Sequence, residues 1–216
     1  AGLARTGHWL VEPPGSAAGW FVKPNRLGAK IGIWGDSRCR TLAEALTLSR
    51  RIFSAYRDDA VVQPYVAGRN ARASFLGLRP DTGVEALGIA FVDSGGDFQT
   101  MDDSLALYGE TGEAAKAGGF YQEPRLAPVA ATQRRADEKI RRIAGTLMQT
   151  LGLRDSFSLD CRIEADDTVH LIEFEVCPGL PCFDFRAYCR SQWNMDLAEA
   201  MAATAASRFT PAETHA

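Results

Sequence analysis

Three stretches of the chain carry apolar residues at the spacing of an amphipathic helix. In the first, Thr41 and Glu44 form a capping-box pattern, and apolar side chains then recur at every third or fourth position over 42–56. The longest such pattern covers Thr132–Leu151, and a shorter one covers Asp196–Ser207. We therefore expect helices over these three stretches.

Shorter segments alternate between apolar and polar residues, or are continuously apolar, as strands are. They are Trp20–Lys23, Ile31–Trp34, Val61–Tyr65, Arg69–Leu78, Val84–Val92, Ser156–Ile163 and Thr168–Val176. We expect the first two to form a hairpin around the loop Pro24–Lys30, and the last two to pair through the turn Glu164–Asp167. The Gly-rich, acidic stretch Asp93–Pro128 predicts an ordered loop or lid, with disorder as the alternative.

Composition narrows the class of protein. The chain has 216 residues and is 46% apolar, enough for one large domain or two small ones, and sheets with helices on them indicate an α+β fold. The net charge of -3 gives no electrostatic reason to expect nucleic acid. No run approaches a membrane span and no signal peptide is visible, so we expect a cytoplasmic protein without a membrane partner. The cysteines are odd in number without a CxxC pair, which favours reduced thiols.

Two glycines and two lysines lie in and around the first predicted hairpin. Gly28 and Gly32 allow backbone N–H groups to approach phosphate oxygens, and Lys23 and Lys30 supply positive charge. Neither the GxxxxGK[ST] nor the GxGxxG signature is present. By itself the pattern favours an ordinary turn that carries exposed lysines, with a phosphate-binding loop as the alternative.

Carboxylates gather on the last predicted hairpin. Asp160 shares a strand face with Ser158 and Arg162, and Glu173 shares one with Glu175, because strand side chains repeat every two residues. If the strands pair, the three carboxylates meet on one patch, where mutual repulsion favours a bound cation. Oxygen ligands without His or Cys select Mg²⁺ or Mn²⁺. The alternative is a polar sheet face that Arg162 neutralises.

Three motifs follow one another in a fixed order. They are Lys-Pro with two spaced glycines at 23–32, an apolar triplet at 64–66 ahead of Gly68, and Asp160 followed by Glu-x-Glu and Pro-Gly at 173–179. In this order they resemble the ATP-grasp superfamily, and within it the D-alanine:D-alanine ligase-like branch. The resemblance covers nearly the whole chain.

The resemblance implies an ATP-grasp fold, in which two α+β subdomains with mixed or antiparallel sheets clamp ATP. The small subdomain, with the glycine loop and the adenine strand, would span 1–66, and the larger one, with the metal-binding strands, would span 67–216. Relatives carry an N-terminal domain that has no counterpart in this chain. We expect the chain to be a fragment, the alternative being a minimal module whose substrate wall comes from a partner.

The resemblance also assigns roles. Lys23 would bridge the α- and β-phosphates, and Gly28, Ala29 and Lys30 would close over the phosphates, with Lys23 and Lys30 as the catalytic cations. The other assignments are Gln63, Tyr65 and Val66 for adenine, Asn70 for the ribose, Asp160, Glu173 and Glu175 for Mg²⁺, and Arg162 and Asp184 for the substrate.

Several positions depart from the pattern of the branch. Glu175 stands where most relatives have Asn, and Ala29 and Lys30 replace the loop serines near the γ-phosphate. Ser158 replaces an Arg, and 180–184 replaces a Ser/Thr run that binds substrate. These departures argue against D-alanine as the substrate.

The implied activity is that of an ATP-dependent carboxylate–amine ligase, which forms a peptide or amide bond through an acyl phosphate. Its cofactors would be ATP and Mg²⁺, or Mn²⁺ in its place, and its partners a small carboxylate and a small amine. The sequence leaves a homodimer open. The alternative function is a nucleotide-binding ATP-grasp protein without ligase activity.

Overall fold

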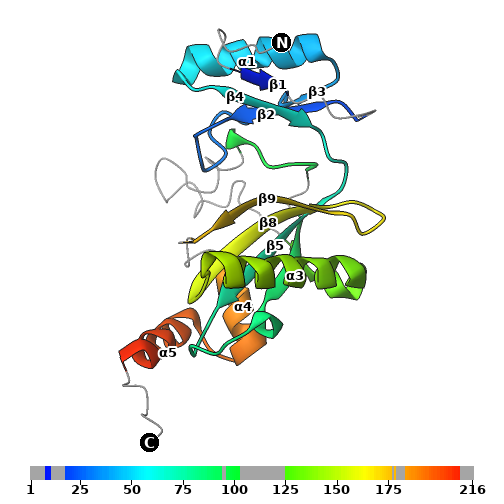
Figure 1. The fold of residues 1–216 in the computed structure, drawn as a ribbon. Helices are drawn as coiled ribbons and strands as arrows, with labels where there is room; N and C mark the ends of the chain where they lie inside the picture. Colours follow the sequence, from blue (N-terminus) through cyan, green and yellow to red (C-terminus); the bar gives the residue numbers. More distant parts are fainter. Residues whose placement is uncertain are drawn as a thin grey trace, which may run out of the picture. The chain divides into compact units, whose positions relative to one another are not determined.

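The computed structural model describes residues 8–10, 18–93, 96–102, 125–176, 178 and 183–209. They form two compact units, each with a sheet and at least one helix, in agreement with the expected α+β class (Figure 1). The first unit contains the chain up to Ala67 together with the segment that begins at Gly96. The second begins at Gly68 and includes the C-terminal part of the chain.

The first unit contains a four-stranded mixed sheet with the strand order β1-β4-β2-β3 and one long helix. Its elements are β1 (His8–Leu10), β2 (Trp20–Pro24), β3 (Arg38–Cys39), α1 (Leu42–Tyr56) and β4 (Ala60–Pro64). β1 runs parallel to β4, and the other pairs are antiparallel. The predicted capping box is present, because Glu44 N–H donates to Thr41 Oγ1 and the Glu44 carboxylate accepts from Thr41 N–H.

Helix α1 covers one face of this sheet. Its buried stripe of Ala45, Leu48 and Ile52 packs against Val22 and Val62 of the central strands. The helix ends at Tyr56, followed by Arg57 in the left-handed conformation. Burial of this apolar stripe is the main reason the helix stays on the sheet.

The prediction that Ile31–Trp34 pairs with β2 as the second strand of a hairpin was wrong. Ile31–Trp34 forms turns, and the strand that pairs with β2 on this side is β3. Ala29 and Lys30 have φ angles of 52° and 62°, Ile31 N–H donates to Gly28 O at 3.1 Å, and Ile33 N–H donates to Lys30 O at 3.0 Å. Since these backbone groups bond locally, they cannot form a sheet ladder.

The second unit contains a five-stranded antiparallel sheet with the order β7-β6-β5-β8-β9. The strands are β5 (Arg69–Leu76), β6 (Gly88–Asp93), β7 (Arg125–Pro128), β8 (Ser156–Ile163) and β9 (Val169–Glu175). The helices are α3 (Arg134–Leu151), α4 (Phe183–Trp193) and α5 (Leu197–Phe209), with the 3₁₀ turns η1 (Val84–Ala86) and η2 (Val129–Ala131). The predicted β8–β9 pairing and the helix over 132–151 are thus confirmed.

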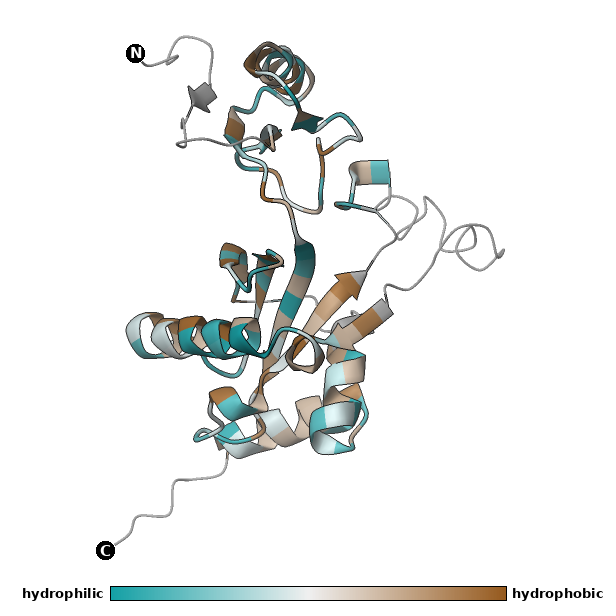
Figure 2. Ribbon diagram, turned by 90° about the vertical axis from the view of Figure 1, so that its right-hand side faces the viewer, coloured by the Kyte–Doolittle hydropathy of each residue, from teal (hydrophilic) through white to brown (hydrophobic). Residues whose placement is uncertain are grey.

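Helix α3 covers one face of the second sheet (Figure 1). Ala136, Ile140 and Ala144 are buried against a core in which the rings of Phe75 and Phe157 stack at 4.7 Å between centroids. Apolar residues recur among polar ones along the helix (Figure 2), as in an amphipathic surface helix. On the opposite face of the strands, Leu76 at one end packs against Phe185 and Tyr188 of α4.

Three elements differ from the sequence expectations. Val84–Ala86 is a 3₁₀ turn ahead of β6, β7 ends the stretch predicted as a lid, and α4 was not predicted. α4 and α5 bury Phe185 and Tyr188 in a separate small core. Most of the predicted lid, the cysteines at 177 and 182, and Gly179 lie outside the described residues.

Candidate functional site

β2 and the loop that follows it carry the residues predicted to contact phosphates. Lys23 lies on β2 opposite Val61, and Lys30 lies in the turn that follows Gly28. Ala29 and Lys30 adopt the left-handed conformation in this turn, and hydrogen bonds from Ile31 N–H to Gly28 O and from Ile33 N–H to Lys30 O close it. The phosphate-binding role of the loop stays a prediction.

The base of this loop is fixed to the two residues that directly precede β4. Asn25 N–H donates to Asp59 O at 2.8 Å, and Arg26 pairs with the buried carboxylate of Asp58 at 2.9 Å. Further along the loop, Gly32 has a φ of 75° and packs so closely against Pro24 that a Cβ atom on it would lie 2.5 Å from Pro24 Cγ. The backbone of the loop is therefore anchored at both ends.

The predicted adenine strand is β4 and the residues directly after it. Gln63 pairs with Phe21, and Tyr65 N–H donates to Gly19 O at 2.9 Å. The ring of Tyr65 is buried, with the guanidinium of Arg38 lying 4.1 Å from its centroid. The ring of Tyr65 is thus covered and its N–H is occupied, and the adenine-binding role of this segment stays a prediction.

Sequence reasoning missed the segment 96–102 as part of this region. Met101 N–H donates to Ile33 O at 2.7 Å, and Asp97 forms an ion pair with Arg38 at 2.9 Å. The ring of Phe98 meets Phe21 edge-on at 5.1 Å. No local sequence pattern signals these long-range contacts.

The predicted metal ligands lie on β8 and β9 in the second unit. Asp160 is directly opposite Glu173, and Ser158 is directly opposite Glu175. A register shift between Asp160 and Cys161 follows this pair. Directly opposed residues of an antiparallel ladder point to the same face, so the three carboxylates share the face that α3 leaves uncovered.

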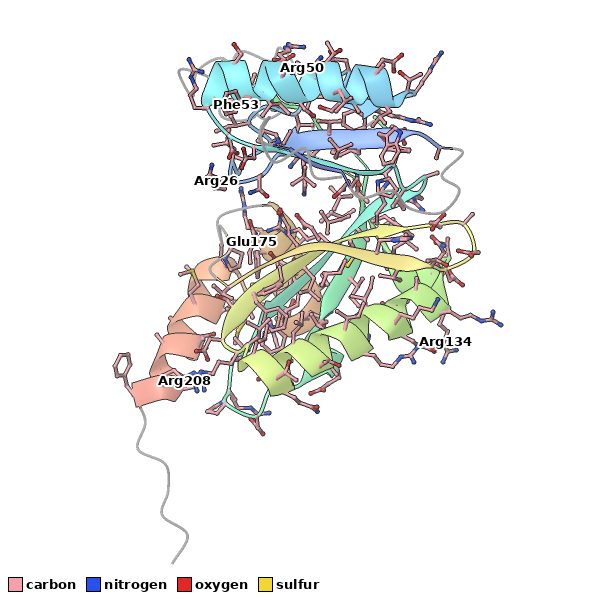
Figure 3. The ribbon with its side chains drawn as sticks, turned by 45° about the horizontal axis from the view of Figure 1, so that its top comes forward. Arg26, Arg50, Phe53, Arg134, Glu175 and Arg208 are labelled. Carbon is pink, nitrogen blue, oxygen red and sulfur yellow. The ribbon has the colours of Figure 1, made fainter. Side chains whose placement is uncertain are left out.

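Arg72 lies on the other side of Asp160, on β5, and was not among the candidates from sequence. Its Nη1 is 3.6 Å from Asp160 Oδ1, and its Nη2 is 2.9 Å from Glu175 Oε2. Nη2 also donates to Ser158 Oγ at 3.0 Å, and Ser158 Oγ donates to Glu175 Oε2 at 3.0 Å. Arg72 thus links two of the three carboxylates (Glu175 is labelled in Figure 3).

Arg162 and Asn70 form a second polar group on the same face. Arg162 is 6% exposed, and its Nη1 donates to Asn70 Oδ1 at 2.8 Å. His170 lies opposite Arg162 on β9, and its Nε2 atom is 2.7 Å from Glu164 Oε1. The predicted ribose residue and a predicted substrate residue therefore contact each other, while Asp184 lies in α4 with its side chain outside the described part of the structure.

The predicted metal ligands are oxygen donors, the kind of ligand that Mg²⁺ takes. Within the described ranges, no group of three or more His, Cys, Asp or Glu side chains could hold a metal ion by itself. Mg²⁺ is usually bound by one or two carboxylates together with substrate phosphates. Asp160 and Glu173 are opposed across the ladder, but Arg72 lies 3.6 Å from Asp160 and 2.9 Å from Glu175. The metal-binding role of the three carboxylates stays a prediction.

Comparisons with known proteins gave matches in structure alone. The sequence matches no protein-family model and no curated protein. D-alanyl-alanine synthetase A from Vibrio cholerae O1 biovar eltor matches 88% of this chain and 52% of its own, with a TM-score of 0.61 and 15% identity. D-alanine–D-alanine ligase from Bacillus anthracis, in complex with ATP, matches 87% and 51%, with a TM-score of 0.57 and 10% identity.

An L-amino acid ligase from Bacillus licheniformis matches 94% of this chain and 43% of its own, with a TM-score of 0.55 and 13% identity. The chain thus spans about half the length of the solved structures it resembles. At these identities the likeness establishes the fold. The chain has the ATP-grasp fold found in D-alanine–D-alanine ligases, as its motifs predicted.

No helix in the described part of the chain is both long enough and apolar enough to cross a membrane.

Proposed function

We propose that this protein is an ATP-dependent carboxylate–amine ligase that forms a peptide or amide bond. The observation that carries the proposal is the direct opposition of Asp160 and Glu173 on adjacent strands of an ATP-grasp fold. Their carboxylates are hard oxygen donors of the kind that suits Mg²⁺. The ATP complex of a structural neighbour supports nucleotide binding by this fold.

In the proposed reaction, a substrate carboxylate attacks the γ-phosphorus of ATP and releases ADP. The amine of a second substrate then attacks the carbonyl carbon of the acyl phosphate and releases phosphate, which completes the amide bond. Mg²⁺ bound through Asp160 and Glu173 would supply charge neutralisation. Lys23 and Lys30 would bind phosphate oxygens as ammonium groups, and the backbone after β4 would hold the adenine.

No side chain of the protein needs to form a covalent bond in this scheme. Its contribution is orientation of the reacting groups and electrostatic stabilisation. The anchored loop between β2 and β3 suits this purpose, since a fixed backbone places Lys30 without ordering a mobile segment at each turnover.

The decisive experiment measures ADP release in the presence of Mg²⁺ and a panel of amino acids and simple amines. The 216-residue chain should be assayed together with any longer product of its gene, because the structural neighbours are about twice as long. Stimulation of ADP release by one acid–amine pair, with the matching amide as product, supports the ligase. Nucleotide binding without any stimulation would instead indicate a nucleotide-binding protein that does not ligate.

Lys23→Gln provides a check on the first unit. It should weaken nucleotide binding, because an ammonium group that contacts phosphates is lost. Arg50→Gln is the matched control, since Arg50 is an exposed cation of the same unit on α1 (Figure 3). Equal binding by both variants would remove Lys23 from the site.

A further inference from the structure

Among the described strands, β9 is the longest that lies at the edge of a sheet. It has seven residues, whereas the other edge strands, β1, β3 and β7, have three, two and four. β7 also ends in Pro128, which has no N–H to donate, and β9 contains neither Pro nor Lys. Of these edges, β9 is therefore the one best suited to pair with a further strand.

Apolar side chains are exposed along this edge. Leu171, Ile172 and Phe174 are 39%, 40% and 41% exposed. Phe174 lies opposite Leu159 of β8, which is fully buried, so this face of the sheet is covered at β8 and becomes open at β9. Removal of such apolar surface from water favours association with another chain.

A bulge gives β9 a pattern that is complementary to itself. Successive residues of β8 pair with Glu173 and then with Leu171, so Ile172 is an extra residue without a partner in the ladder. In a regular strand, residues three positions apart point to opposite faces. The extra residue instead puts His170 and Glu173 on the same face, the one that carries Asp160.

Two copies of β9 can pair in antiparallel fashion about a two-fold axis at this bulge. His170 of each copy then lies opposite Glu173 of the other, and Val169 lies opposite Phe174. An axis perpendicular to the sheet keeps equivalent faces on one side, so opposed residues must share a face, and the members of both pairs do. Pairs of opposite charge, and pairs of an aromatic with a β-branched residue, are favourable between strands.

We propose that β9 pairs with β9 of a second copy of this chain, which joins two five-stranded sheets into one. A second copy is the occupant because the edge matches itself in both charge and apolar pairing. Nε2 of His170 lies 2.7 Å from Glu164 Oε1, so the contact with the second copy uses Nδ1. Glu173 has two oxygens, so the contact is compatible with its proposed role toward Mg²⁺ and does not depend on that role.

Sedimentation velocity of the 216-residue chain over a range of micromolar concentrations tests the proposal. The wild-type chain should form dimers. Phe174→Lys should weaken dimerisation by about tenfold or more, because it removes two apolar pairs and places a charge in each. Phe53→Lys is the matched control, since Phe53 on α1 is also 41% exposed, and it should dimerise as wild type does. A monomeric wild type, or dimers that Phe174→Lys leaves intact, would overturn the proposal.

An exchange of charges tests the register and serves if Phe174→Lys does not fold. His170→Glu should weaken the dimer, because it opposes two carboxylates in each pair, and the double variant His170→Glu, Glu173→His should recover it. Circular dichroism checks that each variant is folded. Unchanged dimers in His170→Glu, or no recovery in the double variant, would contradict the pairing. Protection of β9 from hydrogen exchange in a monomeric longer product of the gene would assign the edge to another part of that chain and likewise overturn the proposal.

Discussion

The carboxylate of Asp58 accepts two hydrogen bonds from Arg26, one from the backbone N–H at 2.8 Å and one from Nε at 2.9 Å. Asp58 is 3% exposed, and Asp59 N–H adds a third bond. Burial by itself raises the pKa of Asp58, but the hydrogen bonds and charge of Arg26 together outweigh it and lower the pKa below its usual value. The loop predicted to bind phosphates is thus anchored to an ionised carboxylate.

Replacing Asp58 with Asn should reduce the free energy of unfolding at neutral pH by about 1–3 kcal/mol, because charge-assisted bonds to a buried group are lost. The lowered pKa means that the stabilisation is present above the pKa of the unfolded chain and is lost as the pH falls through the folded pKa. Urea unfolding of wild type and variant at decreasing pH measures this. Their difference should shrink in acid.

Asp36→Asn is the control for Asp58→Asn, since Asp36 forms an exposed ion pair with Arg51 in the same unit. Such pairs contribute about 0–1 kcal/mol. A difference for Asp58→Asn that does not change with pH would contradict the role assigned to its ionised form.

Gly32→Ala should destabilise the protein by about 1–3 kcal/mol, because its backbone is left-handed and the added methyl group meets the neighbouring ring atoms. The φ angle is 75°, and the Cβ position lies 2.5 Å from Pro24 Cγ and 3.0 Å from Tyr56 Cε2. Thermal unfolding measures the loss. Gly28→Ala, with nothing within 4 Å of its Cβ position, should change stability by less than about 0.5 kcal/mol.

Glu173→Gln should abolish turnover and weaken Mg²⁺-dependent AMPPNP binding by about tenfold or more, a factor that corresponds to only about 1.4 kcal/mol. The amide keeps the shape of the side chain but loses the charge that binds the cation. Calorimetric titration with and without Mg²⁺ separates the metal-dependent part. Glu138→Gln is the matched control, because the carboxylate of Glu138 on α3 is exposed. Normal Mg²⁺-AMPPNP binding by Glu173→Gln would exclude Glu173 as a ligand.

Cys161 should resist alkylation in the native protein. Burial first, and then the nearby charge of Asp160, raise the pKa of its thiol to about 12, and burial likewise raises the pKa of Cys39 to about 11. Only the thiolate reacts with iodoacetamide, and because of these raised pKa values little thiolate exists at pH 8. Peptide mapping after iodoacetamide treatment should find both residues unmodified in the native state and modified in guanidinium chloride, and rapid native labelling of Cys161 would contradict its core position.

Local patterns predicted the elements that depend on nearby residues. The capping box at Thr41, the apolar stripe of α3 and the turn between β8 and β9 are all present in the structure. Each is decided by side chains a few positions apart, which a sequence shows directly. The prediction of a strand over Ile31–Trp34 was wrong because the left-handed residues before it form local turns.

The candidate site was only partly accessible to this reasoning. Asp160 and Glu173 could be placed together because one turn joins their strands. Arg72 could not, since its position beside Asp160 depends on the register of two strands that are distant in sequence. The segment 96–102 joins the first unit for the same kind of reason, through long-range contacts such as Met101 with Ile33.

The sequence by itself determined the α+β class, the long helices and the residue types that the proposed function assigns to ATP and Mg²⁺. These follow from period, caps and charge, which are local properties of the chain. Only the tertiary structure decided which charges meet. Strand order and register bring Arg72 to Asp160 and Glu175, and Asn70 to Arg162, because hydrogen-bonded ladders fix which side chains are neighbours across a sheet.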